Sequence, residues 1–175
     1  MPYRRLFLLV EGSDDERFAK NVLLAIFNEQ YDTVQIVKYS GKSPKKKRQF
    51  INSIMSMRAD YLYLSDINSN PCITTKKTQV QNKVNNIKLD RIRVVITEIE
   101  SWYFAGLKND AAKDLGIDII PDSNTLTKET FNRLIPRHFD SRIDFMIEIL
   151  KRYSRDTAKH NNKSFKYLAE KDLNI

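Results

Sequence analysis

Four acidic residues stand at or directly after short hydrophobic runs, where buried strands would end: Glu11, Asp66, Glu98 and Glu100. Carboxylates that are brought together repel one another and raise each other's pKa unless a cation lies among them. A divalent metal removes this conflict, polarises a phosphoryl oxygen and lowers the pKa of a bound water. If the strands are neighbours in one sheet, these residues predict a hydrolytic metal centre.

A helix is expected to begin directly after Glu11 and Gly12. The sequence Ser13-Asp14-Asp15-Glu16 fits a capping box with Ser13 as the N-cap and Glu16 at the third helical position. Acidic residues in a first turn are also favoured by the helix dipole. Capping and the dipole account for Asp14 and Glu16, which leaves Asp15 as a candidate metal ligand beside Glu11.

A run of cations marks the start of a second expected helix, with Ser43 as its N-cap and Pro44 at its first position. The run contains five cations in seven residues and no acid: Lys42, Lys45, Lys46, Lys47 and Arg48. Cations are disfavoured at the positive end of a helix dipole. Such a local penalty is typical of a phosphate-binding surface, and a plain solvated face is the alternative.

These residues need a scaffold, and the hydrophobic pattern supplies one. We expect strands over residues 4–10, 33–39, 61–66 and 91–97, and helices over residues 13–28, 44–57, 73–86 and 99–106. Strands that alternate with helices predict the α/β class, with a parallel sheet and helices on both faces. The acids at the strand ends would then converge at one edge of the sheet.

The chain changes character after Leu107. Residues 109–124 are predicted to be loop-rich, and shorter helices are expected over residues 128–135, 141–153 and 163–170. We therefore predict an α/β core over residues 1–107 and a helical C-terminal appendage over residues 108–175, packed on the core as one domain.

Composition narrows the class of partner and cofactor. The chain has 175 residues and a formal net charge of +8, which favours a polyanionic partner, nucleic acid before a membrane surface. No apolar run is long enough for a membrane helix, and the N-terminus lacks a signal peptide. The single cysteine, Cys72, excludes an intrachain disulfide and fits a cytoplasmic location. With so few Cys and His residues, a metal would need oxygen ligands, which favours Mg²⁺ or Mn²⁺.

Several motifs resemble those of one family. Residues 10–16 (VEGSDDE) are similar to the Glu-Gly-x-x-Asp opening of Toprim domains, above all those of OLD-family nucleases and of small stand-alone Toprim-like proteins linked to phage defence. Residues 64–68 (LSDIN) fall where the family carries Asp-x-Asp, and residues 97–102 (TEIESW) resemble its Glu-x-Glu-x-Trp segment. Residues 160–165 (HNNKSF) resemble the C-terminal Ser-Phe block of the small members.

The resemblance implies a Toprim-like, Rossmann-like fold and Mg²⁺-dependent cleavage of phosphodiester bonds, with water as the nucleophile. It implies that Glu11, Asp66 and Glu98 act in catalysis, and that Glu11, Asp15, Asp66, Asn68 and Glu100 bind metal. Asn68 stands where the family has a second aspartate. It offers a neutral oxygen without charge, so a second metal would also require Glu98 or Glu100.

A lysine that stabilises the transition state is also implied, with Lys42, Lys163 and Lys166 as candidates. The sequence predicts a metal-dependent nuclease that acts on DNA or RNA. The alternatives are a catalytically impaired module that binds nucleic acid or a partner protein encoded nearby, and a phosphohydrolase of small nucleotides. Each acid also has a structural interpretation: Asp66 could begin a turn, and Glu98 and Glu100 could pair with surface cations.

Overall fold

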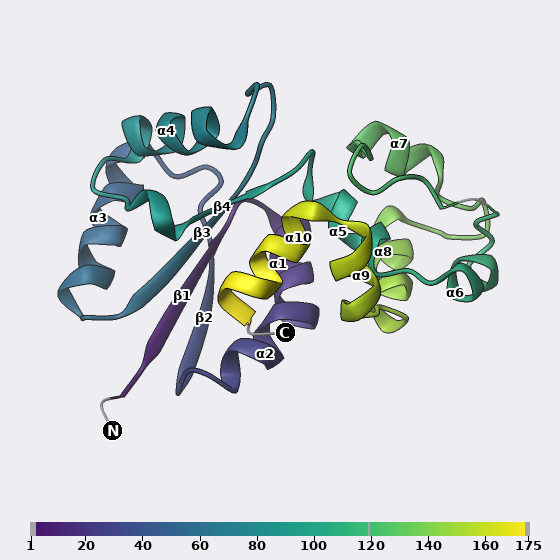
Figure 1. Ribbon diagram of the computed structural model, residues 1–175, viewed down its shortest axis with the longest axis horizontal. Coiled ribbons are helices and arrows are strands. Elements are labelled where there is room, and N and C mark those ends of the chain that lie inside the picture. The colour runs from purple at the N-terminus through teal and green to yellow at the C-terminus, as the bar shows by residue number, and fades with distance from the viewer. Residues whose placement is uncertain (1–2, 119, 174–175) are drawn as a thin grey trace. The chain divides into compact units, whose positions relative to one another are not determined.

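The computed structural model describes residues 3–118 and 120–173, and its first part is built around a four-stranded parallel sheet (Figure 1). Its strands are β1 (Arg5–Val10), β2 (Thr33–Lys38), β3 (Asp60–Asp66) and β4 (Ile92–Val95), in the spatial order β2-β1-β3-β4. In the register, Leu9 of β1 lies beside Val37 of β2 and Tyr63 of β3. The predicted α/β class and parallel sheet are confirmed.

Helices flank the sheet on both faces (Figure 1). One face carries α1 (Ser13–Phe18), the π-helical η1 (Ala19–Leu23) and α2 (Leu24–Asn28), and the other carries α3 (Pro44–Ser56) and α4 (Ile73–Val84). Successive residues of a strand point to opposite faces, so β1 has to be apolar throughout to satisfy both helical layers. Residues 6–10 of β1 are all buried, as this requires.

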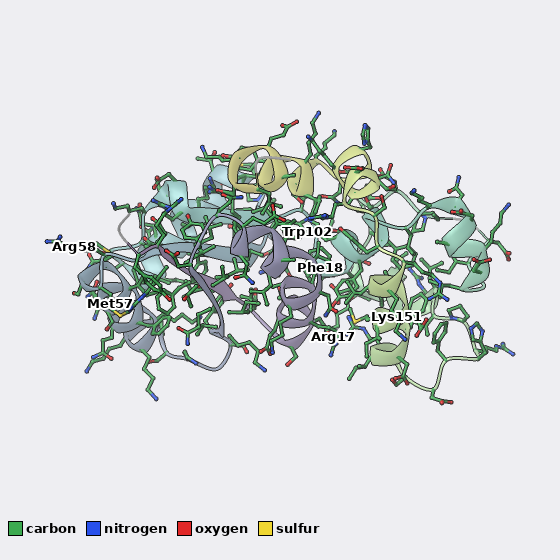
Figure 2. The ribbon with its side chains drawn as sticks, turned by 90° about the horizontal axis from the view of Figure 1, so that it is seen from below. Arg17, Phe18, Met57, Arg58, Trp102 and Lys151 are labelled. Atoms are coloured by element: carbon green, nitrogen blue, oxygen red, sulfur yellow. The ribbon has the colours of Figure 1, made fainter. Side chains whose placement is uncertain are left out.

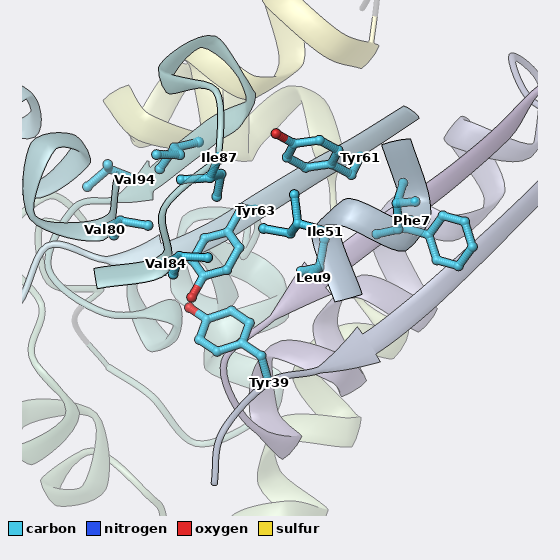
Figure 3. Packing of buried hydrophobic residues seen from close by; sticks show 12 residues of the cluster. Phe7, Leu9, Tyr39, Ile51, Tyr61, Tyr63, Val80, Val84, Ile87 and Val94 are labelled. Carbon is cyan, nitrogen blue, oxygen red and sulfur yellow. The ribbon is translucent and has the colours of Figure 1, made fainter. Parts of the chain in front are cut away.

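The layer between the sheet and α3 and α4 is a continuous hydrophobic cluster (Figure 3). Phe7 and Leu9 of β1 contribute to it, together with Ile51 of α3 and Val80 and Val84 of α4. Met57 and Arg58 project outward just beyond the end of α3 (Figure 2). This packing fixes the start of α3 and the inward face of α4, which both border the candidate site described below.

The described chain divides into two compact units, residues 1–94 and 95–175. In the first unit, the short helix η2 (Leu89–Arg91) directly precedes β4. After β4 the second unit is helical, with α5 (Ile99–Ala105), α6 (Asn109–Asp114), α7 (Lys128–Arg133), α8 (Arg142–Lys151), α9 (Arg155–Asn161), α10 (Lys163–Leu168) and η3 (Ala169–Leu173). Its core is aromatic, with Trp102, Phe104, Phe131, Phe145 and Phe165 all fully buried. The expected single domain with a boundary after residue 107 stays a prediction.

Most expected elements are present, and three details were wrong. Residues 109–124 were expected to be loop-rich, but they contain the helix α6. The helix α9 was not expected, and it lies between the two expected helices that became α8 and α10. The N-cap of α1 is Gly12 and its third helical position is Asp15, one residue earlier than predicted for each. None of the helices over residues 3–118 and 120–173 has the length and apolar character to cross a membrane.

Candidate functional site

The carboxyl ends of β1 and β3 form a crevice at the point where the strand order reverses. From β1 the chain leads to α1 on one face, and from β3 it leads to α4 on the other. Ligands of open α/β sheets bind at such a switch point. A cavity of about 190 Å³ lies here, and its walls are Glu11, Tyr39, Pro44, Lys47, Tyr63, Ser65, Asn68, Lys76, Gln79, Val80, Lys83 and Val84.

Glu11 is held at this edge by the backbone of two neighbouring segments. Its carbonyl oxygen accepts a hydrogen bond from Ser40 N at 3.0 Å, just after β2. Continuing the register of β1 and β3 by two residues places Glu11 opposite Ser65 and next to Asp66. Glu11 lines the cavity and Asp66 does not, so the convergence of these two carboxylates stays a prediction.

Three lysines share the cavity with Glu11: Lys47 of α3, and Lys76 and Lys83 of α4. The Lys47 ammonium lies 4.6 Å from the centre of the Tyr39 ring. Burial lowers the pKa of Lys47, and the Glu11 carboxylate opposes this shift. Burial likewise lowers the pKa of Lys76, against the opposing effect of Glu11 and Asp66. Because cations outnumber acids among the lining residues, the cavity attracts anions.

Lys76 and Lys83 were not among the residues predicted from the sequence. The signal for Lys76 is its spacing, because residues 76, 80 and 84 lie on one face of α4. Val80 and Val84 are buried in the core, so Lys76 occupies the inward, apolar stripe of the helix. This placement brings a buried lysine to the border between the core and the cavity.

Tyr39 and Tyr63 form one wall of the cavity as a stacked pair, with ring centroids 4.4 Å apart (Figure 3). The Tyr39 hydroxyl donates to the carbonyl oxygen of Leu64 at 2.6 Å. Burial raises the pKa of Tyr63 to about 12 and that of Tyr39 well above its usual value. Both phenols therefore stay protonated at neutral pH.

Asn68 lies at the cavity in a left-handed backbone conformation, with φ +51°. Asparagine adopts this conformation more readily than most residues because its side chain can hydrogen-bond locally. Its Nδ2 donates to the carbonyl oxygen of Asp66 at 3.3 Å, a contact that leaves the amide oxygen unused. The turn that follows β3 thus gives a backbone reason for asparagine at position 68, besides its predicted role as a ligand.

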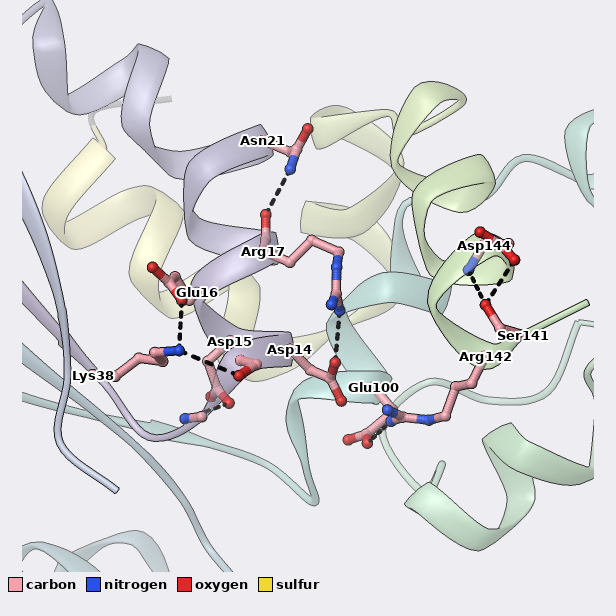
Figure 4. Close-up of polar contacts among 12 residues, drawn as sticks. Asp14, Asp15, Glu16, Arg17, Asn21, Lys38, Glu100, Ser141, Arg142 and Asp144 are labelled. Atoms are coloured by element: carbon pink, nitrogen blue, oxygen red, sulfur yellow. Dashed lines mark hydrogen bonds and ion pairs between the residues drawn. The ribbon is translucent and has the colours of Figure 1, made fainter. Parts of the chain in front are cut away.

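Asp15 proves to be the residue that caps α1. Its Oδ2 accepts a hydrogen bond from Gly12 N at 3.1 Å, and the residue is buried (Figure 4). Asp14 pairs with Arg17 at 2.6 Å, and Glu16 pairs with Lys20 and Lys38. The capping role was predicted for Glu16 and is filled by Asp15 instead. Asp15 as a metal ligand stays a prediction, and capping already accounts for its carboxylate.

Glu98 and Glu100 belong to the second unit, where each has a partner. Glu98 Oε2 accepts a hydrogen bond at 2.6 Å from the backbone N–H of Lys128, the first residue of α7. Glu100 is buried and forms an ion pair with Arg142 of α8 (Figure 4). The structural interpretation given for these acids therefore has specific contacts behind it. Their predicted catalytic and metal-binding roles stay predictions.

The basic run has the predicted helix start. Ser43 is the N-cap of α3, its side chain accepts from Lys46 N at 3.3 Å, and Pro44 opens the helix. Within the run, Lys47 is the residue that lines the cavity. The others have no cavity contact: Lys42, Lys45 and Lys46 are exposed, and Arg48 is half-buried. Of the other candidate catalytic lysines, Lys163 and Lys166 are exposed in the second unit.

Oxygen donors for one Mg²⁺ or Mn²⁺ are present in the first unit: the carboxylates of Glu11 and Asp66 and the amide oxygen of Asn68. Within residues 3–118 and 120–173, no three His, Cys, Asp or Glu side chains are grouped so as to hold a metal ion. Mg²⁺ in phosphoryl-transfer sites is often held by one or two carboxylates, water and the phosphates of the substrate. Of these donors, Glu11 and Asn68 line the cavity, so an ion held there would have to be completed by water and by oxygens of the ligand.

Comparisons with known proteins add little to this geometry. No protein-family model matches the chain, and no curated protein matches it. A solved structure that it resembles is the C-terminal region of the OLD protein of Xanthomonas campestris pv. campestris, with a TM-score of 0.42 and 16% sequence identity. The match covers 98% of this chain and 86% of that chain. At this level of similarity the functional argument has to rest on the cavity.

Proposed function

We propose that this chain binds a phosphate group of a nucleic acid in the cavity at the ends of β1 and β3, and that it hydrolyses a phosphodiester bond there. The observation that carries the proposal is the meeting of Glu11 with Lys47, Lys76 and Lys83 at the switch point of the sheet. Lysine ammonium groups are common phosphate ligands, and the net charge of +8 suits a polyanion. The motifs that resemble Toprim nucleases support the same class of activity.

The residues divide into two functional groups. Lys47 and Lys83 would hold the phosphate, while Glu11, Asp66 and Asn68 would hold Mg²⁺ or Mn²⁺ together with the phosphate oxygens. When bound, such an ion supplies charge for the phosphoryl oxygens and lowers the pKa of water. The exposed lysines at the start of α3 would contact the neighbouring backbone of the nucleic acid without base specificity.

The test is cleavage of single-stranded and double-stranded DNA and RNA by the wild-type protein in Mg²⁺ or Mn²⁺. Glu11→Gln keeps the size of the side chain and removes its charge, so we expect a loss of activity of at least about a hundredfold. Glu29→Gln, at an exposed position just after α2, is the matched control and should cleave like wild type. If wild type and Glu11→Gln cleave equally, or neither cleaves, the proposed hydrolysis is wrong.

A binding module without turnover is the second candidate, and the excess of lysine over acid in the cavity favours it. In that case nucleic acid binds equally well to wild type and Glu11→Gln, without metal, and no substrate is cleaved. Turnover of nucleotides with none of polymers would select a small-nucleotide phosphohydrolase instead. Stable binding of a partner protein encoded nearby, with no affinity for nucleic acid, would place the chain in a third class. The link to phage defence is a prediction that these assays leave open.

A further inference from the structure

A groove on the exposed side of α4 adjoins the cavity at the ends of β1 and β3. The two share a wall, because Gln79 and Lys83 line both of them. The other residues that line the groove come from α4 and from the segment before it: Asn70, Thr74, Thr75, Thr78 and Asn82. A ligand held in the cavity can therefore extend into the groove along the surface of the first unit.

The helical spacing of α4 explains how one helix serves both sites. Residues four apart form rows along a helix, and consecutive residues lie on different rows. The row of Gln79 and Lys83 lies between the buried row that contains Lys76 and the exposed row that contains Thr78 and Asn82. The cavity thus reaches the middle row from the core side, and the groove continues from there onto the exposed row.

The chemistry of the walls changes between the two sites. The cavity is lined by charged groups, among them Glu11, Lys47 and Lys83. Among the described residues that line the groove, Lys83 is the one with a charge, and the others carry amides or hydroxyls. A nucleotide changes in the same order, from a charged phosphate to a sugar and a base that form hydrogen bonds. The order of groups on α4 therefore matches a nucleotide whose phosphate lies in the cavity.

The sizes of the two sites give a second, independent argument. The cavity holds about 190 Å³, which is below the range of roughly 300–1,000 Å³ that is typical of small-molecule sites. It suits a phosphate better than a whole nucleotide. The groove that continues it holds about 510 Å³. The room for the rest of a nucleotide is therefore on α4.

A side-chain contact fixes the border between the two sites. Asn70 Nδ2 donates a hydrogen bond to Gln79 Oε1 at 3.2 Å and another to the carbonyl oxygen of Ile67 at 3.0 Å. This contact ties the turn after β3 to α4 and orients the Gln79 amide. The NH₂ group of that amide can donate to a phosphate oxygen or to a sugar hydroxyl.

We infer that this groove is the subsite for the nucleoside attached to the bound phosphate, with Thr78 and Asn82 as its hydrogen-bonding side chains and Gln79 at its border with the cavity. The inference rests on the proposed function for the binding of a nucleic-acid phosphate in the cavity. It is independent of hydrolysis, because a nucleoside is bound whether or not a bond is cleaved. It adds that part of the affinity for nucleic acid comes from uncharged groups.

Thr78→Ala/Asn82→Ala tests the groove and leaves the cavity walls in place. Alanine is the best helix former, so α4 should keep its structure. Fluorescence anisotropy without metal measures binding of labelled single-stranded oligothymidine and oligouridine. For the polymer that wild type binds more tightly, the affinity should fall at least about fivefold, because two hydrogen bonds are lost. Calorimetric titration with inorganic tripolyphosphate should give the wild-type affinity, because this probe has no nucleoside.

Asn52→Ala/Ser56→Ala is the matched control. It removes an amide and a hydroxyl with the same spacing from exposed positions of α3, and it should bind all three probes like wild type. Neither double variant removes a charge, so the slope of log affinity against log salt should also stay that of wild type. Wild-type affinity of Thr78→Ala/Asn82→Ala for both oligonucleotides, an equal loss for tripolyphosphate, or an equal loss in the control would overturn the inference.

The outcomes separate this inference from the proposed function. A wild-type protein that binds none of the three probes overturns the phosphate site, and the inference with it. Oligonucleotide binding that Thr78→Ala/Asn82→Ala weakens, in a protein that cleaves nothing, supports the nucleoside subsite while the proposed hydrolysis fails. Cleavage by a protein whose affinity does not depend on Thr78 and Asn82 supports hydrolysis and overturns the subsite.

Discussion

At the scale of single residues, two of the cavity lysines, Lys47 and Lys76, are removed from water in part or almost wholly, and this sets a pH range for ligand binding. Burial lowers the pKa of both Lys47 and Lys76. An exposed lysine loses its proton near pH ~10.4, so these two should become neutral at lower pH. Affinity for a single-stranded oligonucleotide should therefore fall as pH rises through that lower range. Between the folded and unfolded pKa values the unfolded chain binds more protons, so stability should rise with pH there.

Fluorescence anisotropy of a labelled oligothymidine, measured in steps from neutral to alkaline pH without metal, checks the binding part of this prediction. Arginine stays protonated throughout, so Lys47→Arg/Lys76→Arg should hold its affinity to higher pH than wild type. If the two proteins lose affinity over the same range, these lysines do not control binding.

The places of Glu11 and Asp66 at the ends of β1 and β3 could be predicted from the sequence, because a parallel sheet brings the ends of neighbouring strands to one edge whatever the side chains are. Lys76 could not be identified in the same way. Its role depends on which face of α4 is buried, and the polar composition of α4 hides that face. The capping role was assigned to Glu16 instead of Asp15 for a local reason: capping begins at Gly12, which needs no side chain and so leaves no signal in the sequence.

At the scale of elements, one buried serine joins α5 and α10. Ser164 Oγ accepts hydrogen bonds from Trp102 Nε1 at 2.8 Å and from Ile96 N at 3.2 Å, and it donates to Asn162 Oδ1 at 2.8 Å. Ser164→Ala would leave two donors without this acceptor in a buried site. We expect a loss of about 2–4 kcal/mol in the unfolding free energy of the second unit.

Urea unfolding followed by tryptophan fluorescence measures this loss selectively, because Trp102 is the only tryptophan in the sequence and lies in the second unit. Ser56→Ala, at the exposed end of α3, is the control and should stay within about 0.5 kcal/mol of wild type. A similarly small effect for Ser164→Ala would contradict the prediction. The contacts also show that the Ser-Phe block at residues 160–165 supports the helical packing.

The elements themselves were largely predictable where hydrophobic periodicity is strong. β1 is apolar from Leu6 to Val10 because both of its faces are covered there. The α8 helix was also expected from helical spacing, although the residues that it buries are Phe145, Met146 and Ile149. Both α6 and α9 escaped prediction because they are short, and each contributes a single buried side chain, Ala112 or Ala158. Such helices depend on tertiary packing more than on their own sequence, so periodicity cannot reveal them.

At the scale of the whole molecule, the distribution of charge is more informative than its sum. The net charge of +8 includes surface ion pairs that cancel locally, such as Lys151 and Arg152 with Glu148 in α8. The start of α3 has no acid in its first turn, although cations there oppose the helix dipole. We therefore expect the salt dependence of nucleic-acid binding to arise mainly from this segment of the first unit.

Lys45→Gln/Lys46→Gln tests that expectation. If each lysine neutralises one phosphate of a single strand, the slope of log affinity against log salt should become shallower by roughly 1.4, since counterion release contributes about 0.7 for each contact. Lys108→Gln/Lys113→Gln removes the same charge from exposed positions in the second unit and should leave the slope unchanged. Removing cations from the first turn of α3 should not destabilise the helix, so unfolding cannot mimic the effect. Equal slopes for the two double variants would contradict the prediction. They would mean that binding of the nucleic acid depends on the net charge alone and that the start of α3 does not contact its phosphates.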